Sequence, residues 1–478
     1  MRSDVWFPGL TVLAFTLVLT GTATSQVPDF DADFADRTMR VDYFHTGSST
    51  DEIISLDRIV SDGHWAGSRT RLVDDTNMGK YLFEVRDLST DRMLFSRGFA
   101  SIYGEWETTG EAKQVHRTFH ESVRFPWPLR PVKVVLLERD GPQSFEEIWS
   151  TEIRPDSRFV YGVDRGPGGT VYPVFENGPP SEKVDLVLVG EGYTEAEAEK
   201  FLADVRRLTD KLFSTEPFLS RREDFNVRAI HVPSEHSGVN RPHVGEYRRT
   251  PLSTEYNIFD SERYLLTLDN RALRDALSGV PYEFVEILVN EKQYGGGGIF
   301  NFQATVAVDT EFADYVFVHE FGHHFAGLAD EYYTSDVAYE TGGSSHPEPW
   351  EPNATALHDP GALKWADLVE AGTPVPTPWQ KDRYEEHSRE IRTQRQALID
   401  RAAPEAEFDA LFARQRALED ELLATMQYAN HVGAFEGAMY EASGLYRPEI
   451  DCIMFTRAEF FCRVCRRAIQ RIIDLYST

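Results

Sequence analysis

Two histidines four positions apart, with a glutamate directly after the first, are the residues of this chain best suited to chemistry: His319, Glu320 and His323. On a helix this spacing places both imidazoles on one face, where they can bind a single metal ion. Glu320 lies beside them and could take a proton from a metal-bound water. The apolar run before them, residues 313–318, suits a buried helix. The pattern predicts a zinc hydrolase site, although His-Glu-x-x-His also occurs by chance in long chains.

The residues after this motif supply a third candidate ligand. Gly327 can adopt the left-handed conformation that ends a helix, so the chain would turn back toward the metal at Asp330. Metzincin peptidases use His-Glu-x-x-His-x-x-Gly-x-x-His or Asp, and this chain resembles them except that Gly327 comes one residue later. We therefore expect a slightly longer helix and Asp330 as the third ligand, with Glu331 as the alternative. His324 points away from the other two histidines and is expected to be packed or to support a ligand.

A methionine near the C-terminus gives a second signal. Metzincins carry a methionine in a tight turn beneath the zinc, and Met454 is placed late in the chain as such a turn requires, although core packing is the ordinary role of methionine. Cys452, Cys462 and Cys465 flank it. In an exported protein a disulfide from Cys452 to Cys462 or Cys465 would fix this turn and leave one free thiol. A structural metal site is the alternative, and its fourth ligand would have to be a distant group such as His431.

Further motifs are spread along most of the chain. They are Phe99 to Trp106 with Glu111 and Ala112, Gly190 to Thr194, Tyr294 with the glycines after it, His319 to Tyr333, Trp350 to Asn353, Pro374 to Pro378, Phe435 to Tyr440, Tyr446 to Pro448 and Cys452 to Cys465. Together they resemble the immunoglobulin A peptidase (M64) family of zinc metallopeptidases, whose founding member cleaves that antibody. The resemblance implies a secreted zinc endopeptidase with an N-terminal β domain. It does not imply the founder's substrate, because specificity depends on the details of a pocket.

Length, composition and charge limit the class of protein. A chain of 478 residues with 41% hydrophobic residues is long enough for two or three domains, each with a core. The formal charge of −29 argues against nucleic acid or an anionic membrane as a partner, because most of the surface would repel phosphate groups. The resemblance to the peptidase family implies a protein or peptide substrate instead.

The N-terminus has the features of a cleavable signal peptide, residues 1–25. Arg2 precedes an apolar stretch, residues 10–19, which is too short to span a bilayer, and Ala23-Thr24-Ser25 offers a cleavage site. An uncleaved anchor is the alternative. No cysteine follows the cleavage site and no later stretch is long and apolar enough for a membrane helix. We expect a secreted or periplasmic protein without stable membrane association.

The pattern of apolar residues predicts a multidomain α+β protein. Residues 27–155 contain short strand-like runs and predict an all-β sandwich, and residues 165–180 are rich in glycine and proline and predict a linker. Residues 183–478 alternate strands and helices and predict a metzincin-like α/β zinc peptidase domain, with a helical-hairpin insertion at residues 380–428. The hairpin could cover the cleft or lie on the surface. Four tryptophans of the first domain could bind sugar, but core packing is the commoner role: Trp65, Trp106, Trp127 and Trp149.

Four consecutive glycines, Gly295 to Gly298, precede a predicted strand over residues 299–308. They lack the lysine of a phosphate-binding loop. A substrate peptide could extend the sheet here, with the glycines allowing close approach, and a flexible turn is the alternative. Asn353 begins a glycosylation sequon by form.

The predicted mechanism is hydrolysis of an internal peptide bond by zinc-activated water. His319, His323 and Asp330 would hold the metal, and Glu320 would act as general base. Tyr446 could donate to the tetrahedral oxyanion, with core packing as the alternative role. Other functions stay open: a zinc amidase or exopeptidase that acts on cell-wall material, or a secreted glycan- or protein-binding protein with a structural metal. An intact Glu320 argues against the binding protein, because a structural site needs no general base.

Overall fold

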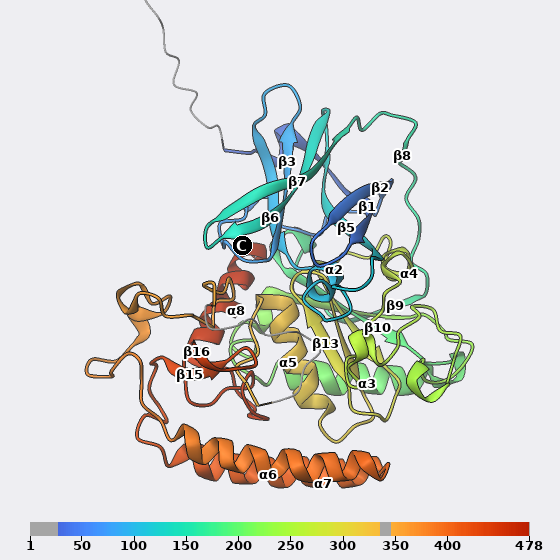
Figure 1. Ribbon diagram of the computed structural model, residues 1–478. Coiled ribbons are helices and arrows are strands. Elements are labelled where there is room, and N and C mark those ends of the chain that lie inside the picture. The colour runs from blue at the N-terminus through green and yellow to red at the C-terminus, as the bar shows by residue number, and fades with distance from the viewer. Residues whose placement is uncertain (1–26, 335–345, 478) are drawn as a thin grey trace, which may run out of the picture.

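A computed structural model describes residues 27–334 and 346–477 of the chain. Two layers of β-sheet form the N-terminal part, and a larger mixed sheet with helices packed against it forms the remainder (Figure 1). The expected signal peptide, residues 1–25, lies outside the described residues. Within the described ranges, no helix combines the length and the apolar character needed to cross a membrane.

The N-terminal part is a β domain of two four-stranded sheets, in the orders β5-β1-β2-β8 and β4-β3-β6-β7. Inward-facing residues alternate along β5, where Phe119, Val123 and Phe125 are buried, because successive side chains of a strand point to opposite faces. Phe125 shares a core with Phe83 and Val134 of the other sheet. The bounds are α1 Phe30–Asp33, β1 Phe34–Gly47, β2 Glu52–Ser61, β3 Tyr81–Asp87, β4 Met93–Phe99, α2 Ile102–Trp106, β5 Arg117–Pro128, β6 Val132–Gly141, β7 Ser144–Ile153 and β8 Val160–Tyr161.

The four tryptophans of this domain take part in packing and do not form an exposed platform. Trp65, Trp106 and Trp127 are buried in hydrophobic clusters. Trp149 is half-buried, and its ring packs against Tyr43. The expectation of core packing is confirmed for them.

The second part is built on a six-stranded sheet in the order β13-β14-β12-β10-β11-β9. Strands β10, β11, β12 and β14 are parallel, and both edge strands are antiparallel to their neighbours. Every residue of β10, β11 and β12 is buried, as expected for parallel strands that are covered on both faces. The strand bounds are β9 Thr170–Phe175, β10 Val184–Glu191, β11 Phe225–His231, β12 Phe284–Val289, β13 Gly296–Ile299 and β14 Gln303–Ala307. The helix bounds are α3 Ala198–Leu212, α4 Asn270–Ala276, α5 Ala313–Ala326 and α8 Arg463–Tyr476.

Two sequence-based expectations for this part differ from the structure. The single strand expected over residues 299–308 is a hairpin of β13 and β14, because Asn301 adopts a left-handed conformation, φ 53°, and reverses the chain. Residues 165–180 are not only a connection, since β9 lies within them and pairs with β11 at the edge of the sheet. The strand was not predicted because glycines and prolines, which disfavour strands, surround it.

The expected helical hairpin is present. Helices α6, Lys381–Asp400, and α7, Glu405–Ala424, run side by side, and Pro404 occupies the N-cap of α7 (Figure 1). A small two-stranded sheet follows it, β15 Phe435–Ala438 and β16 Glu441–Arg447. Short 3-10 helices lie at η1 Pro180–Glu182, η2 Glu195–Glu197, η3 Arg222–Asp224, η4 Pro242–Val244, η5 Ile258–Asp260, η6 Pro360–Ala362 and η7 Ala366–Leu368.

The β domain and the larger part share a hydrophobic cluster. Trp106 and Phe119 of the β domain pack with Phe259, Leu266 and Phe302 of the larger part. The backbone N–H of residue 100 donates to the carbonyl oxygen of residue 300 over 2.9 Å. The N–H of Asn301, next in the chain, donates to the carbonyl oxygen of His324 over 2.8 Å, so the β domain is fixed against the end of the sheet at which the histidine helix ends.

Candidate metal centre

Helix α5 carries the histidine motif and ends where the sequence predicted. Gly327 is its C-cap, in the left-handed conformation with φ 55°. Strand β13 approaches the helix so closely that a Cβ at Gly298 would lie 2.3 Å from the carbonyl oxygen of Glu320 and 2.9 Å from Cβ of His323. The glycine run is therefore required for close packing of an edge strand against the helix.

Three donor atoms meet at the end of α5. The Nε2 atoms of His319 and His323 are 3.1 Å apart. Asp330 Oδ1 lies 3.1 Å from the first and 3.2 Å from the second. Ligands at about 2.0–2.2 Å from a tetrahedral zinc ion are separated by about 3.3–3.6 Å, so this triangle is close to the size that zinc requires.

The other ring nitrogen of each histidine is occupied by the backbone. His319 Nδ1 donates to the carbonyl oxygen of Ile453 over 2.9 Å, and His323 Nδ1 donates to that of Leu328 over 2.5 Å. A carbonyl oxygen can only accept, so both Nδ1 atoms carry the proton and both Nε2 atoms present a lone pair to the centre of the triangle. Asp330 Oδ1 is buried and receives no hydrogen bond from the described residues. These donors fit a divalent metal ion.

The electrostatics of the centre favour positive charge. Burial lowers the pKa of His323, but the neighbouring Asp330 carboxylate outweighs burial and raises this pKa to about 9. Burial raises the pKa of Asp330, but His323 and His319 together outweigh it and hold this pKa well below its usual range. Burial also raises the pKa of Glu320, against the opposing effect of both imidazoles. A cation between these groups would satisfy them without protons.

The two candidate carboxylates after Gly327 point to different places. Asp330 completes the triangle, whereas Glu331 is fully buried and contacts Asn353 and two cysteines. The geometry supports Asp330 as the third ligand. Asn353 itself is buried, donating to the carbonyl oxygen of Ala329 over 2.9 Å, so the sequon is closed to a sugar in this fold.

Tyr440 is a functional candidate that the sequence reading missed. Its hydroxyl donates to Asp330 Oδ2, and its backbone N–H donates to the carbonyl oxygen of Tyr332 over 3.0 Å. Met439 and Tyr440 form the two-residue turn between β15 and β16, and both have positive φ, 49° and 64°. Neither is the glycine or asparagine that this turn favours, so the turn is strained at the residue that holds Asp330. The signal in the sequence was the place of Tyr440 at the end of the motif Phe435 to Tyr440, which was noted without a role for this residue.

Tyr446, the expected oxyanion donor, is not brought to the centre. It lies in β16, opposite Glu436 and bridged to Thr355, and does not line the cleft. Successive side chains of a strand point to opposite faces, so the motifs that surround Tyr446 in the sequence did not show which way its side chain points.

Met454 and His324 occupy supporting positions. Met454 is fully buried in a tight turn, in which the N–H of Phe455 donates to the carbonyl oxygen of Cys452 over 2.8 Å. A Cβ at Gly322 would meet Met454 Sδ at 3.1 Å, so the sulfur lies against the histidine helix. His324 is fully buried, with Nδ1 donating to a carbonyl oxygen and Nε2 accepting from an N–H, and burial lowers its pKa to about 3. The expectation that His324 is packed is confirmed.

Comparison with known proteins adds the family. The sequence profile of the family described as IgA Peptidase M64 matches residues 172–473, and that of the Peptidase M64 N-terminus matches residues 29–150. The chain belongs to the M64 peptidase family. Its members are metallopeptidases, as the sequence resemblance implied. No curated protein matches the chain.

The cleft of this M64 peptidase surrounds the donor triangle and has a volume of about 580 Å³. Its walls come from three parts of the molecule. The β domain contributes Lys80 and Glu105, the sheet part contributes Tyr264 and the glycine strand, and the helical hairpin contributes Tyr384 and Phe412, among others. The hairpin therefore forms part of the cleft wall, which the sequence alone did not decide.

The edge of β13 is mostly covered in this M64 peptidase. Gly296 pairs with the segment before it, since its N–H donates to Arg263 and its carbonyl oxygen accepts from Leu265, both over 3.2 Å. The carbonyl oxygen of Phe300 accepts from Ala100. Between Gly296 and Phe300, only Gly298 has an N–H and a carbonyl group that face away from β14 and have no backbone partner among the described residues. Addition of a substrate strand is thus restricted to a short stretch.

Proposed function

We propose that this M64 peptidase is a secreted zinc-dependent endopeptidase. The donor triangle of His319, His323 and Asp330 would hold the metal, with Glu320 as the general base. The observation that carries the proposal is the direction of the two Nε2 lone pairs toward a buried carboxylate oxygen, at separations of 3.1 and 3.2 Å. Glu320 offers an oxygen within 4.8 Å of both histidine ligand atoms, close enough to serve a water held at the same place.

The chain's own groups would divide the work of hydrolysis. A bound zinc ion would supply Lewis acidity and lower the pKa of water. Glu320 would accept the proton of the attacking water and return it to the departing amine, and the raised pKa that its burial causes suits both transfers. The backbone carbonyls of Ile453 and Leu328 would keep the imidazoles in one tautomer and one orientation.

The shape of the cleft supports a protein or peptide substrate. A volume of about 580 Å³ lies within the range of roughly 300–1,000 Å³ that is usual for ligand sites. Walls from the β domain and from the helical hairpin on either side would contact residues that flank the scissile bond. Gly298 would contact the substrate backbone. Export rests on the signal-peptide features of residues 1–25.

Substitution of Glu320 tests this function. Glu320→Gln should keep the metal and lose nearly all hydrolysis, since an amide cannot accept the proton, and the expected fall in kcat is about 10²–10⁴-fold or more. The purified chain, residues 26–478, is incubated with denatured casein and with folded secreted proteins, and products are mapped by mass spectrometry. Internal cuts that a zinc chelator blocks are expected.

The controls separate the other functions. His324→Gln is a matched change on the same helix, at a histidine outside the triangle, and it should not abolish activity in the fraction that folds. Full activity of Glu320→Gln would remove it as the base. Release of single terminal residues only would indicate an exopeptidase, and cleavage of cell-wall peptides alone would indicate an amidase.

A further inference from the structure

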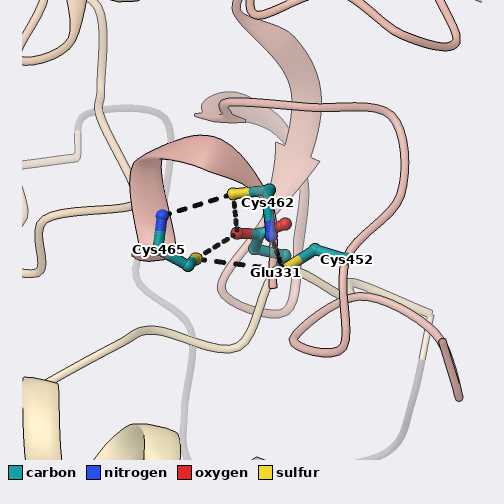
Figure 2. Close-up of side chains that lie close together, drawn as sticks. All are labelled: Glu331, Cys452, Cys462 and Cys465. Carbon is teal, nitrogen blue, oxygen red and sulfur yellow. Dashed lines mark hydrogen bonds between the residues drawn. The ribbon is translucent and has the colours of Figure 1, made fainter. Parts of the chain in front are cut away.

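A second group of metal-binding side chains lies behind the donor triangle. Cys452, Cys462, Cys465 and Glu331 are all buried, and each offers one ligand atom such that all four lie within 4.8 Å of one another (Figure 2). The cysteines come from the methionine turn and the start of α8, and the glutamate follows the candidate ligand Asp330. The sequence reading allowed a metal here but named distant His431 as the fourth ligand. His431 is not part of the group.

We propose that these four residues form a structural zinc site with three thiolates and one carboxylate. It is distinct from the catalytic centre, and it stands or falls independently of the proposed endopeptidase activity. On binding, the three thiols would lose their protons to solvent and form bonds to the ion, with Glu331 as the fourth ligand. No oxidant is needed.

The separations of the ligand atoms match a tetrahedral zinc ion. With Zn–S bonds of about 2.3 Å and Zn–O bonds of about 2.0–2.2 Å, two sulfurs are about 3.8 Å apart, and a sulfur and an oxygen are about 3.5 Å apart. Sγ of Cys452 lies 3.8 Å from Sγ of Cys465. Glu331 Oε1 lies 3.4 Å from Sγ of Cys465 and 4.0 Å from that of Cys462. All three cysteines are free thiols in this structure, and a disulfide would require a sulfur separation of about 2.05 Å.

The backbone is arranged to support thiolates. The N–H of Cys462 donates to Sγ of Cys452 over 3.2 Å, and the N–H of Cys465 donates to Sγ of Cys462 over 3.4 Å. Cys462 is the N-cap of α8, where the partial positive charge of a helix terminus favours an anionic sulfur. Figure 2 draws both of these hydrogen bonds.

The carboxylate lacks a full set of partners without a metal. Glu331 is 0% exposed, and its Oε1 accepts from Asn353 over 2.9 Å. Its Oε2 has no hydrogen-bond partner among the described residues. A buried carboxylate with an unmet oxygen is costly, and a cation would remove that cost.

The site would connect three segments that surround the catalytic centre. Glu331 is bonded to Asp330 in the chain, and its N–H donates to the carbonyl oxygen of Met454 over 2.8 Å. Cys452 lies next to Ile453, whose carbonyl oxygen orients His319. A metal at this place would therefore fix both the third ligand and the methionine turn.

The first test measures metal and its ligands. The full mature chain is loaded with zinc chloride, and loosely bound ions are removed by dialysis. We expect two zinc ions per chain. In a variant that combines His319→Ala and His323→Ala, one zinc should remain, with three sulfur neighbours at about 2.3 Å in X-ray absorption.

The outcomes separate this site from the catalytic one. A remaining zinc without sulfur neighbours, or a folded double variant without zinc, would overturn the structural site. One zinc with sulfur neighbours in the unsubstituted chain would support the structural site and refute the proposed catalytic zinc.

A thiol count provides an independent test. After unfolding and chelation, three free thiols per chain are expected. A count of one would mean that two cysteines form a disulfide, which would also overturn the site.

Ligand variants test Glu331 against His431. Glu331→Gln should release the sulfur-bound zinc to a chelator at least about tenfold more readily, since even an outer-sphere partner typically contributes that much affinity. His431→Gln is the matched control and should have no effect. The reverse result would show that the fourth ligand is wrongly assigned. If Glu331→Gln does not fold, the number of sulfur neighbours in the unsubstituted chain still decides the proposal.

Discussion

At the residue scale, the directions of side chains are set by backbone carbonyls. His319 and His323 each donate Nδ1–H to a carbonyl oxygen, from Ile453 and Leu328. The carbonyl of Ile453 belongs to a loop that is distant in sequence, and that of Leu328 belongs to the loop that follows the helix. These loops therefore decide which nitrogen of each ring faces the donor triangle. The same loops place the two neighbouring carboxylates in separate environments.

Alanine variants at those two carboxylates should have different effects. Asp330→Ala is expected to empty the histidine site while the sulfur-bound zinc remains. Glu331→Ala should remove the sulfur-bound zinc and weaken the histidine site by about 10–100-fold, the range of outer-sphere losses. Zinc content and X-ray absorption after dialysis distinguish these results. Retention of the histidine-site zinc in Asp330→Ala would exclude this residue as the third ligand.

Tyr440 should act as a positioning residue. Tyr440→Phe removes the hydroxyl that donates to Asp330 Oδ2, so zinc affinity at the histidine site should fall by about 10–100-fold. Tyr446→Phe is the matched control, because that hydroxyl lies outside the cleft. Competition with a chelator measures both. Equal affinities in the two variants would show that the contact with Asp330 has no role.

At the scale of elements, the site on helix α5 is built with a glycine-rich strand, β13, and with a tight turn between β15 and β16 that contains no glycine. Strand β13 is almost entirely glycine, which lets it pack closely under the helix. The turn of β15 and β16 uses Met439 and Tyr440 in conformations that glycine would adopt more easily. Glycine therefore occurs in β13, where the helix leaves no space for a side chain. The strained turn instead carries larger residues, one of which, Tyr440, contacts Asp330.

Strand β1 carries a histidine whose charge should stabilise the β domain. His45 lies between Glu52 and Glu121, at 2.7 and 3.0 Å. Burial lowers its pKa, but Glu121 and Glu52 together outweigh burial and raise the pKa to about 9. Since this exceeds the unfolded value of about 6.5, the stabilisation is fully present below pH 6.5 and is lost as pH rises through 9.

A histidine substitution tests this pH dependence. His45→Gln should lower the thermal midpoint at pH 6 and flatten its dependence between pH 6.5 and 9, with an effect of about 2–4 kcal/mol at low pH. His116→Gln is the control, since that side chain is 65% exposed. Thermal unfolding at several pH values measures all three proteins. Parallel curves for His45→Gln and the unsubstituted chain would contradict the assignment.

At the scale of the whole molecule, the β domain is a wall of the cleft and part of a shared core. Lys80 and Glu105 reach the cleft from the β domain, and Tyr264 hydrogen-bonds to Glu105 across the junction. Arg40, at 1% exposure, pairs with Asp275 of the larger part. Removal of one partner from such a contact leaves the buried charge of the other uncompensated and strongly destabilises the fold.

Removal of the β domain should therefore damage the peptidase part. A chain that begins at residue 162 would expose Phe259, Leu266 and Phe302 of the shared cluster. We expect it to aggregate or to unfold at a lower temperature than residues 26–478, and to lose activity on proteins. Size-exclusion chromatography, thermal unfolding and casein cleavage check this. A monomer with an unchanged melting temperature and kcat/KM would show that the β domain is independent.

The sequence by itself determined the elements and the local chemistry. The period of apolar residues gave the β domain, the buried parallel strands and the helical hairpin, and the spacing of His319 and His323 with Gly327 gave the helix and its end. These features depend on neighbours within a few residues, so the chain displays them directly. Strand β9 was missed because glycine and proline surround it.

Only the tertiary structure decided which distant groups meet. It separated Asp330 from Glu331, brought Tyr440 instead of Tyr446 to the centre, and placed Glu331 among three cysteines more than a hundred residues later in the chain. Contacts of this kind depend on the packing of loops around a helix and on the face to which a strand residue points. Neither is encoded in local spacing, because a shift of one residue redirects a side chain.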